Sequence, residues 1–461
     1  MNRFLPLFVL VFLFACNTES EKTGKNSSTQ SVTFVTLDPG HFHAALVQKT
    51  MFPGVDSNVY VYAPAGPDLD QHLKRIEGFN TRAENPTHWH EVVYTGPDFF
   101  QKMIDEKKGN VVVMAGNNQK KTEYILKTIE AGMNVLADKP MAINKEGFEM
   151  LKTAFDKAKE NNVLLYDIMT ERFEINTMLQ KEFSQIKTLF GELEKGTPEN
   201  PAITKESVHH FYKSVSGSTL QRPAWFFDVT QQGEGIVDVT THLVDMIQWA
   251  CFPEQILDYT KDVEMISARR WPTGMDLSDF TEVTKMDSFP HYLQNDVLNN
   301  KIFNVFSNGE INYKLKGVHA KVLVKWSYKA PEGTGDTHYS IMRGTRANLI
   351  IRQGAEENFK PVLYIQPAIE GDATFDKAVT SATVKLEKKY PGIRVKKTAD
   401  SWQVVVPESY NVGHEAHFGQ VTEKYLQYLK VGKLPDWEVP NMITKYYITT
   451  TALEMAQKGT Q

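Results

Sequence analysis

The chain has 461 residues, of which 41% are hydrophobic and 23% are charged, a composition typical of an ordinary globular protein. Lysine and arginine together number 51 against 56 for aspartate and glutamate, and no long basic run interrupts the sequence, which argues against a nucleic-acid partner. The length suits two or three domains, and the two cysteines are too few for a disulfide framework.

The N-terminus has the organisation of a bacterial lipoprotein precursor. An apolar run over residues 4–14 has the length of a signal-peptide core and is too short to cross a bilayer. It ends in Leu-Phe-Ala-Cys, which resembles a lipobox, so we expect a signal peptide over 1–15 and acylation of Cys16. Residues 16–30 are polar and predict a flexible tether. We therefore expect an exported lipoprotein with a lipid anchor, periplasmic or held at the outer membrane.

Residues 31–168 alternate short apolar runs with amphipathic helices. The clearest helix places Phe148, Leu151 and Phe155 at spacings of three and four. Repeated strand and helix units predict an α/β domain with a doubly wound parallel sheet, in which ligands bind at the carboxyl ends of the strands. The expected strands are Val32–Leu37, Asn58–Tyr62, Glu91–Tyr94, Val111–Met114, Asn134–Leu136 and Val163–Tyr166.

Residues 169–461 have a different pattern. A strong helix over 237–250 is followed by alternating runs that predict strands at 320–326, 348–351 and 362–366. We expect an α+β domain with an open, mainly antiparallel sheet. Two final helices, about 415–430 and 441–457, carry apolar stripes and are expected to pack back across the domain junction.

The first strand leads into Gly40, His41, Phe42 and His43, where a dinucleotide-binding fold lets phosphates meet a helix N-terminus. Only the last glycine of a G-x-G-x-x-G pattern is present there. A tight turn with no ligand is an equally simple interpretation of this segment alone.

Two further segments stand in the order and spacing of known motifs. Residues 115–118 (Ala-Gly-Asn-Asn) and 132–140 (Gly-Met-Asn-Val-Leu-Ala-Asp-Lys-Pro) resemble the A-T-P-N and G-x-x-V-x-x-E-K-P segments of the Gfo/Idh/MocA oxidoreductases. The resemblance implies a Rossmann domain and places Lys139 beside the nicotinamide and the substrate hydroxyl; otherwise Lys139 is an exposed lysine at a strand end. The other cofactor-binding residues that it implies are Ala115, Asn117, Asn118 and Asp138.

A third match opens the second domain. Residues 233–245 resemble the family's G-G-G-x-x-x-D-x-x-x-H-x-x-D segment. On a helix, Asp238, His242 and Asp245 would share one face. A histidine with a carboxylate one turn away suits general acid/base chemistry, since imidazole titrates near neutrality. We predict that His242 transfers the proton, that Asp238 orients the imidazole of His242, and that Asp245 faces the substrate.

Two less specific segments add candidates. Arg172 lies in a segment that resembles the family's N-x-R-F junction and is expected to frame the cofactor, with an interdomain salt bridge as the alternative. Arg222 and Trp225 combine a cation with an aromatic plane, which suits sugar binding, although core packing is the alternative for Trp225.

Histidine pairs raise the question of a metal. His88 and His90, His209 and His210, and His414 and His417 each lack a third ligand at a readable spacing. The last pair is three apart, not the four of H-E-x-x-H. We predict no catalytic metal.

The resemblance covers nearly all of residues 32–461. The exported form is similar to a lipoprotein subgroup from Bacteroidetes-type bacteria that is associated with carbohydrate breakdown and with oxidation of glycosides to keto-sugars. It implies an NAD(P)-dependent oxidoreductase acting on a sugar or glycoside hydroxyl by hydride transfer, with the cofactor retained during turnover and a homo-oligomer by family habit. NAD is favoured, but NADP stays open because Asp68 lies beyond the usual position of the ribose-binding acid. An NAD-dependent glycosidase and a non-catalytic sugar-binding lipoprotein also stay open.

Overall fold

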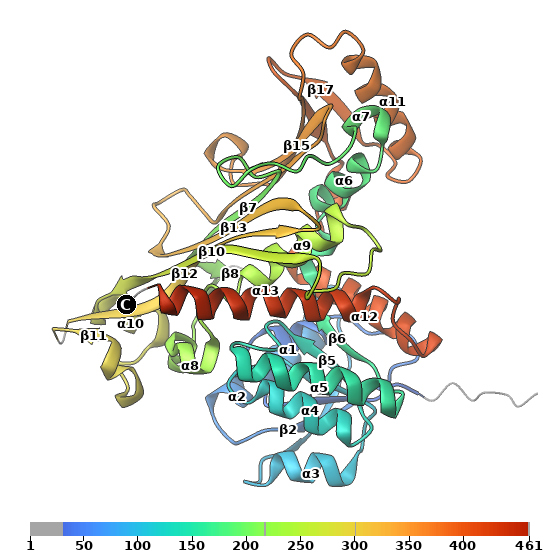
Figure 1. Ribbon diagram of the computed structural model, residues 1–461. Helices are drawn as coiled ribbons and strands as arrows, with labels where there is room; N and C mark the ends of the chain where they lie inside the picture. The colour runs from blue at the N-terminus through green and yellow to red at the C-terminus, as the bar shows by residue number, and fades with distance from the viewer. Residues whose placement is uncertain (1–30, 216–217, 300, 460–461) are drawn as a thin grey trace, which may run out of the picture. The chain divides into compact units, whose positions relative to one another are not determined.

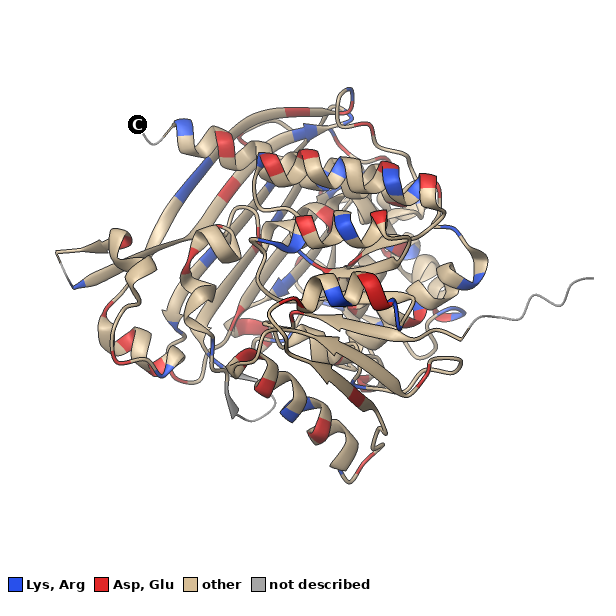
Figure 2. Ribbon diagram, turned by 90° about the horizontal axis from the view of Figure 1, so that it is seen from below, with Lys and Arg blue, Asp and Glu red and all other residues tan. Residues whose placement is uncertain are grey.

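The computed structural model describes residues 31–215, 218–299 and 301–459. The expected signal peptide, Cys16 and the tether lie outside the described residues. From Val32 onward the chain forms one compact unit. Among the described residues, no helix is both long and apolar enough to span a membrane. In the view of Figure 2, acidic and basic residues are interspersed along the helices, and no face of one charge sign is seen.

The first sheet confirms the predicted doubly wound parallel sheet. Its six strands pair in parallel in the order β3-β2-β1-β4-β5-β6, so the direction of winding reverses between β1 and β4. A reversal of this kind opens a crevice at the carboxyl ends of the two strands. The bounds are β1 Phe34–Leu37, β2 Asn58–Tyr62, β3 His90–Tyr94, β4 Val111–Met114, β5 Asn134–Asp138 and β6 Leu165–Ile168.

Five helices accompany this sheet. Helix α5 buries Phe148, Leu151 and Phe155, the face that the spacing predicts, and its N-cap Asn144 accepts a hydrogen bond from the backbone of Gly147. The helices are α1 His43–Leu46, α2 Pro67–Thr81, α3 Phe99–Glu106, α4 Lys121–Glu130 and α5 Lys145–Asn161.

Among the described residues, the second sheet has ten strands, of which only β7 and β13 pair in parallel (Figure 1). All of its other pairs are antiparallel, which confirms the expected open, mainly antiparallel sheet. Its strands are β7 Ile203–Tyr212, β10 Val263–Met275, β11 Val297–Leu298, β12 Ile302–Leu315, β13 Val318–Lys329, β14 Thr337–Arg343, β15 Ala347–Gln353, β16 Val362–Pro367, β17 Arg394–Lys397 and β18 Trp402–Val405. A separate small pair consists of β8 Ser214–Val215 and β9 Ser218–Thr219.

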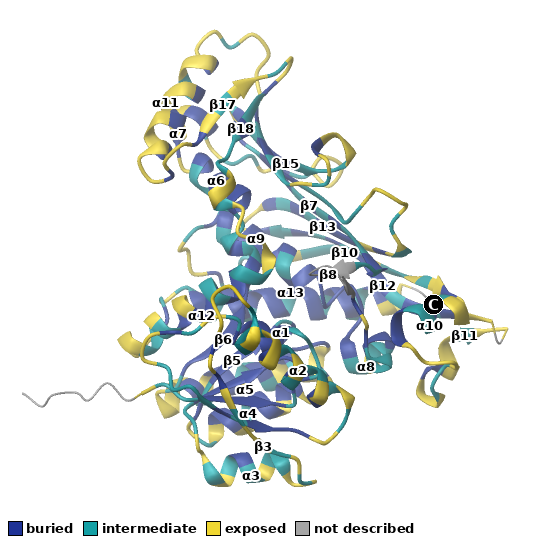
Figure 3. Cartoon of the chain, turned by 180° about the vertical axis from the view of Figure 1, so that it is seen from behind, coloured by how far each residue is buried: buried dark blue, intermediate teal, exposed yellow. Residues whose placement is uncertain are grey.

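The helices of the second part connect the two sheets. Helix α13 passes between α5 and the larger sheet (Figure 1), and side chains of α12 and α13, including Phe418 and Tyr446, belong to the core of the parallel sheet. Strands β1, β4, β5 and β6 of the parallel sheet and helix α9 are largely buried, whereas the edge strands β3 and β17 are not (Figure 3). The helices are α6 Ile175–Ser184, α7 Lys187–Phe190, α8 Val229–Gln232, α9 Thr240–Cys251, α10 Leu277–Thr284, α11 Phe375–Glu387, α12 His414–Val431 and α13 Glu438–Lys458, with short 3-10 turns at Thr170–Phe173, Ala224–Phe227, His291–Asp296, Ala355–Glu357 and Glu408–Tyr410.

Helix α9 begins at Thr240, later than the sequence pattern predicts. Residues 235–239 form turns instead, and Gly235 packs so closely against the backbone of Ser307 that an added Cβ would overlap the Ser307 carbonyl oxygen. Asp238 therefore lies in a turn before the helix, whereas His242 lies on the helix. This difference decides what Asp238 can contact.

Candidate active site

A cavity of about 1620 Å³ lies where the carboxyl ends of β1, β4 and β5 meet α9 and the larger sheet. Lys139, Asp238 and His242 all line it, so the three residues predicted to be catalytic share one site. They come from opposite sides of the cavity: Lys139 follows β5 of the parallel sheet, whereas the other two belong to the second domain. A cavity at this edge of a doubly wound sheet is the usual place for a ligand.

The turn after β1 is held against the turn after β4. A Cβ on Gly116 would lie 2.2 Å from the carbonyl oxygen of Asp38, so only glycine allows this approach of the two backbones. Asp38 itself has a φ of 47°. Burial, with a further contribution from Asp68, raises the pKa of Asp38 to about 6.

His43 is fixed by the residue that precedes the candidate catalytic lysine. Its Nδ1 lies 2.9 Å from Oδ2 of Asp138, and Nδ1 of His41 lies 3.8 Å from the same oxygen. Lys121 donates to the backbone oxygen of Asp138, 3.1 Å away, and burial lowers the pKa of Lys121 to about 8. These contacts place the predicted residues His41, His43 and Asp138 together.

The same three residues form a group that could hold a metal ion. One ligand atom from each of His41, His43 and Asp138 lies within 4.8 Å of the others. The histidine pairs considered in the sequence do not include His41 and His43, whose acidic partner Asp138 lies 95 residues after His43 along the chain. A metal there would replace the hydrogen bond between His43 and Asp138.

Lys139 is paired directly with Asp238. Its Nζ lies 2.6 Å from Oδ1 of Asp238, and the amide of Gln232 donates to Oδ2 at 3.1 Å. Both side chains are largely buried, with exposed fractions of 11% and 8%. The lysine is therefore held by an ion pair that spans the two domains, and it is not the exposed strand-end lysine of the alternative.

His242 lines the cavity, and one of its ring nitrogens is buried without a partner in the described part of the chain. Its Nδ1 has no hydrogen-bond partner among the described residues. Burial, followed by the positive charge of Lys139, lowers the pKa of His242 well below the usual 6.5. The imidazole is therefore neutral at physiological pH and free to accept a proton.

The predicted orienting contact between Asp238 and His242 is not formed. Asp238 uses its two carboxylate oxygens for Lys139 and Gln232, because it lies in the turn before α9 and not one helical turn below the histidine. Asp238 positions the lysine instead.

The structure does not place Asp245 or Arg172 at the cavity. Arg172 donates two hydrogen bonds of 2.7 Å to Asp245 and two more to Glu438 on α13. Lys445 lies 3.0 Å from Asp245 and 2.6 Å from Asp167. The substrate-binding role expected for Asp245 and the cofactor-binding role expected for Arg172 are therefore corrected: Asp245 is 2% exposed, and the salt-bridge alternative for Arg172 describes the observed contacts.

Trp225 and Arg222 occupy different places. The indole of Trp225 donates to Asp68 at 2.8 Å and lies so close to Gly40 that an added Cβ there would be 3.0 Å from it. Trp225 thus covers the turn after β1 and does not line the large cavity. Arg222 does line it, with its guanidinium over the rings of Phe226 and Trp326, and burial lowers its pKa to about 10.

The remaining expected residues follow β4. Ala115 is 1% exposed, and its carbonyl accepts from the backbone of His41. Asn117 donates to the side chain of Gln231, and Asn118 donates to the backbone of Gln232, so both hold α8 against the parallel sheet. Asn118 also lines the cavity, and its side-chain oxygen has no partner among the described residues.

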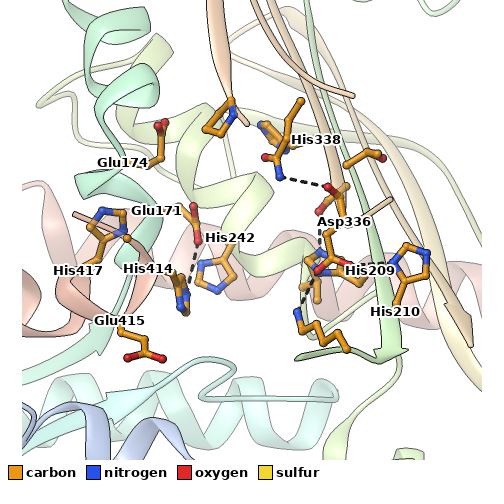
Figure 4. Close-up of a pocket in the computed structure, with 18 of the residues that line it drawn as sticks. Glu171, Glu174, His209, His210, His242, Asp336, His338, His414, Glu415 and His417 are labelled. Atoms are coloured by element: carbon orange, nitrogen blue, oxygen red, sulfur yellow. Dashed lines mark hydrogen bonds and ion pairs between the residues drawn. The ribbon is translucent and has the colours of Figure 1, made fainter. Parts of the chain in front are cut away.

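Two polar groups of the cavity were not predicted (Figure 4). In one, His414 of α12 lies 3.8 Å from Glu171, and burial lowers the pKa of His414 to about 4. In the other, Asp336 is surrounded by His209, His210 and Lys213. The sequence showed both histidine pairs but gave no sign of their acidic partners, which lie more than a hundred residues away along the chain.

The residues at the carboxyl edge fit a nicotinamide dinucleotide. Gly116 lets the turns after β1 and β4 pack backbone against backbone at the crossover of the two strands, and it lines the cavity there. His43 begins a helix directly after this turn. Lys139, at the end of β5, faces the cavity in which a substrate would meet the nicotinamide. The side chains that would hold the cofactor are therefore those of the turns after β1, β4 and β5.

Comparisons with known proteins agree with this fold. A family model described as "Oxidoreductase family, NAD-binding Rossmann fold" matches residues 69–166, and one described as "Putative oxidoreductase C terminal domain" matches residues 179–457. A solved structure described as "a putative oxidoreductase from Parabacteroides merdae ATCC 43184" is 58% identical, with 93% of this chain and 98% of that chain covered and a TM-score of 0.91.

More distant structures share the fold. Levoglucosan dehydrogenase in complex with NADH and levoglucosan is 14% identical, with 93% of this chain and 98% of that chain covered and a TM-score of 0.58. An oxidoreductase structure from Thermotoga maritima gives the same identity, coverage and TM-score. No curated protein matches the chain. On the two family models and the close relative, the chain belongs to the Gfo/Idh/MocA oxidoreductase family, with an NAD-binding Rossmann domain followed by the family's C-terminal oxidoreductase domain.

Proposed function

We propose that this oxidoreductase oxidises a hydroxyl group of a sugar or glycoside to a ketone, or catalyses the reverse reduction. The observation that carries the proposal is the neutral imidazole of His242 in the same cavity as the Lys139–Asp238 ion pair. The distant structure of levoglucosan dehydrogenase, which binds levoglucosan and NADH, supports a sugar as the substrate class.

The chain's own residues supply the proton chemistry. His242, which lines the cavity, accepts the proton of the substrate hydroxyl on its imidazole ring. The ammonium of Lys139 stabilises negative charge that develops on the substrate oxygen, and Asp238 holds that ammonium in place. When bound, NAD would accept the hydride that leaves the carbon bearing this hydroxyl.

The proposal predicts the pH dependence of sugar oxidation. Because the pKa of His242 is lowered below 6.5, the neutral form that accepts a proton persists when the pH falls to that value. The oxidation rate should therefore stay at its plateau near pH 6.5 and fall only in more acidic solution, measured as kcat/KM across the acid range. A fall in kcat/KM that is centred above pH 6.5 in the wild-type protein and is absent in His242→Gln would contradict this assignment.

A product screen tests the reaction itself. The protein without residues 1–30 is purified, loaded with NAD+, and mixed with a panel of methyl glycosides and disaccharides. Reduced nicotinamide together with a product that has lost two hydrogen atoms is the expected result. A cleaved glycosidic bond without net reduction would replace the proposal with the redox-neutral glycosidase. Sugar binding without any chemistry would replace it with the sugar-binding protein.

We further propose that the cofactor stays bound between turnovers and that Cys16 anchors the exported protein. The basis is the N-terminal sequence, since an exported enzyme meets no assured pool of free nicotinamide. Dinucleotide that co-purifies through gel filtration supports retention, and its rapid loss contradicts it. Incorporation of labelled fatty acid into the full chain, abolished by Cys16→Ala, tests the anchor.

A further inference from the structure

The wall of the cavity formed by the larger sheet carries a second set of linked polar residues. Ser207 and His209 are two apart on β7, so both side chains project from the same face of the strand. Asp336 approaches them from the segment before β14. Figure 4 shows His209 and Asp336 on a different side of the cavity from His242 and Glu171. All of the members of this set line the cavity.

Their contacts form a chain from serine to histidine to aspartate. The hydroxyl of Ser207 lies 2.6 Å from Nε2 of His209, and Nδ1 of His209 lies 3.5 Å from Oδ2 of Asp336. The imidazole stacks on Trp326 with 5.0 Å between the ring centroids, which fixes the plane of the imidazole ring. His210 and Lys213, at 2.8 and 2.9 Å, hold the carboxylate of Asp336. The orientation of His209 is therefore set from two sides.

This orientation decides which atom carries each hydrogen. Because Nδ1 of His209 faces a carboxylate, Nδ1 carries the ring proton and Nε2 is left as an acceptor. The Ser207 hydroxyl then donates to Nε2. Burial lowers the pKa of His209 below its usual value, against the opposite effect of Asp336, and Lys213 adds to the lowering. Across the strand pair, His338 on β14 is itself kept neutral by burial, which lowers its pKa to about 3. The ring of His209 is neutral in this arrangement.

A serine hydroxyl has one hydrogen and two lone pairs. Since His209 takes the hydrogen of Ser207, what remains for a ligand is the oxygen as an acceptor. A group that can donate a hydrogen bond satisfies that oxygen, whereas a group that only accepts does not.

We propose that Ser207 is a substrate-recognition residue that accepts a hydrogen bond from a substrate hydroxyl other than the one being oxidised, with His209 and Asp336 as the positioning residues that make it an acceptor. The inference rests on the proposed sugar substrate and adds a specificity that the oxidation itself does not require. A polyhydroxylated ring can place one hydroxyl at His242 and another at Ser207, whereas a simple alcohol has a hydroxyl only for His242.

The test uses methyl β-D-glucopyranoside and its monodeoxy and monofluoro analogues with the NAD-loaded protein. At one ring position, both the deoxy and the fluoro analogue should lower kcat/KM by about tenfold to a hundredfold, because a buried acceptor is left unpaired. In Ser207→Ala the loss of kcat/KM for analogues altered at that position should shrink to about twofold, and the losses for analogues altered elsewhere should remain. Ser207→Thr, which keeps the hydroxyl, should keep the discrimination. Thr204→Ala, on the same strand with its side chain on the other face, is the matched control.

A second variant tests the positioning residues. In His209→Leu the Ser207 hydrogen is free to turn toward the substrate, so the fluoro analogue should regain affinity relative to the deoxy analogue. A merely structural role for His209 would lower binding of all analogues equally and would overturn this part of the inference.

Calorimetric binding of the same sugars to NADH-loaded protein separates the two claims. Binding with the expected discrimination but without oxidation would overturn the proposed function and leave Ser207 as a recognition residue. Oxidation with an unchanged analogue pattern in Ser207→Ala would overturn the inference and leave the function in place. Absence of any sugar binding would overturn both.

Discussion

Replacement of His242 by glutamine is expected to lower the turnover number by about 10²- to 10⁴-fold, the usual contribution of a general acid/base. Glutamine keeps a polar side chain of similar length but cannot take up a proton. Burial lowers the pKa of His242, which lines the cavity as a neutral imidazole together with Lys139 and Asp238. The measurement is single-turnover reduction of bound NAD+ by the sugar found in the product screen.

The control for this variant is His291→Gln, since His291 is exposed and outside the cavity. NADH binding by fluorescence should be unchanged in both variants, which separates chemistry from cofactor loss. Full turnover in His242→Gln would remove the histidine from the mechanism and leave the Lys139–Asp238 pair to account for the proton.

Replacement of Asp245 by asparagine is expected to lower the free energy of unfolding by about 3–5 kcal/mol, the usual cost of breaking a buried ion pair. The change leaves Arg172 and Lys445 buried without the carboxylate that they share. Burial would raise the pKa of Asp245, but these two cations hold it below its usual range, so the carboxylate is charged at neutral pH. Urea unfolding monitored by circular dichroism measures the loss.

Asp156→Asn is the matched control because Asp156 is exposed on α5. If Asp245→Asn does not fold, Asp245→Glu, which keeps the charge, should fold with a smaller loss. A normal unfolding free energy in Asp245→Asn with a raised KM for sugar would restore the substrate-binding role that the sequence predicts.

The regular parts of the fold could be predicted because their signals are local. The apolar runs of β2 and β4 match the observed bounds, and the spacing of Phe148, Leu151 and Phe155 identifies the buried face of α5. Strand and helix alternation then fixes a parallel sheet, and the position of Lys139 after β5 places it at the ligand-binding edge.

The roles of the polar side chains were harder to predict because they depend on contacts between distant residues. Helical spacing suggested that Asp238, His242 and Asp245 act together, but Asp238 lies in a turn before α9 and pairs with Lys139. Asp245 is instead enclosed by Arg172 and Lys445, and Lys445 lies 200 residues later. No local pattern encodes such partners.

The same limit applies to the sheet wall. The pair His209 and His210 suggested only a metal ligand in the sequence, whereas the structure joins it to Asp336 across 126 residues. Ser207 and His209 are two residues apart, a spacing that places both side chains on one face of a strand. That spacing indicates a site only once the cavity is known to lie on the same face.

Transfer of deuterium from substrate to cofactor tests the central claim most directly. The NAD+-loaded protein is mixed anaerobically with a glycoside that carries deuterium on the carbon whose hydroxyl is oxidised, and the released dinucleotide is examined by mass spectrometry. The account predicts deuterium on the nicotinamide together with a ketone on that carbon, and loss of both in His242→Gln. Protein that binds the cofactor and the glycoside yet leaves the deuterium on the sugar would contradict it.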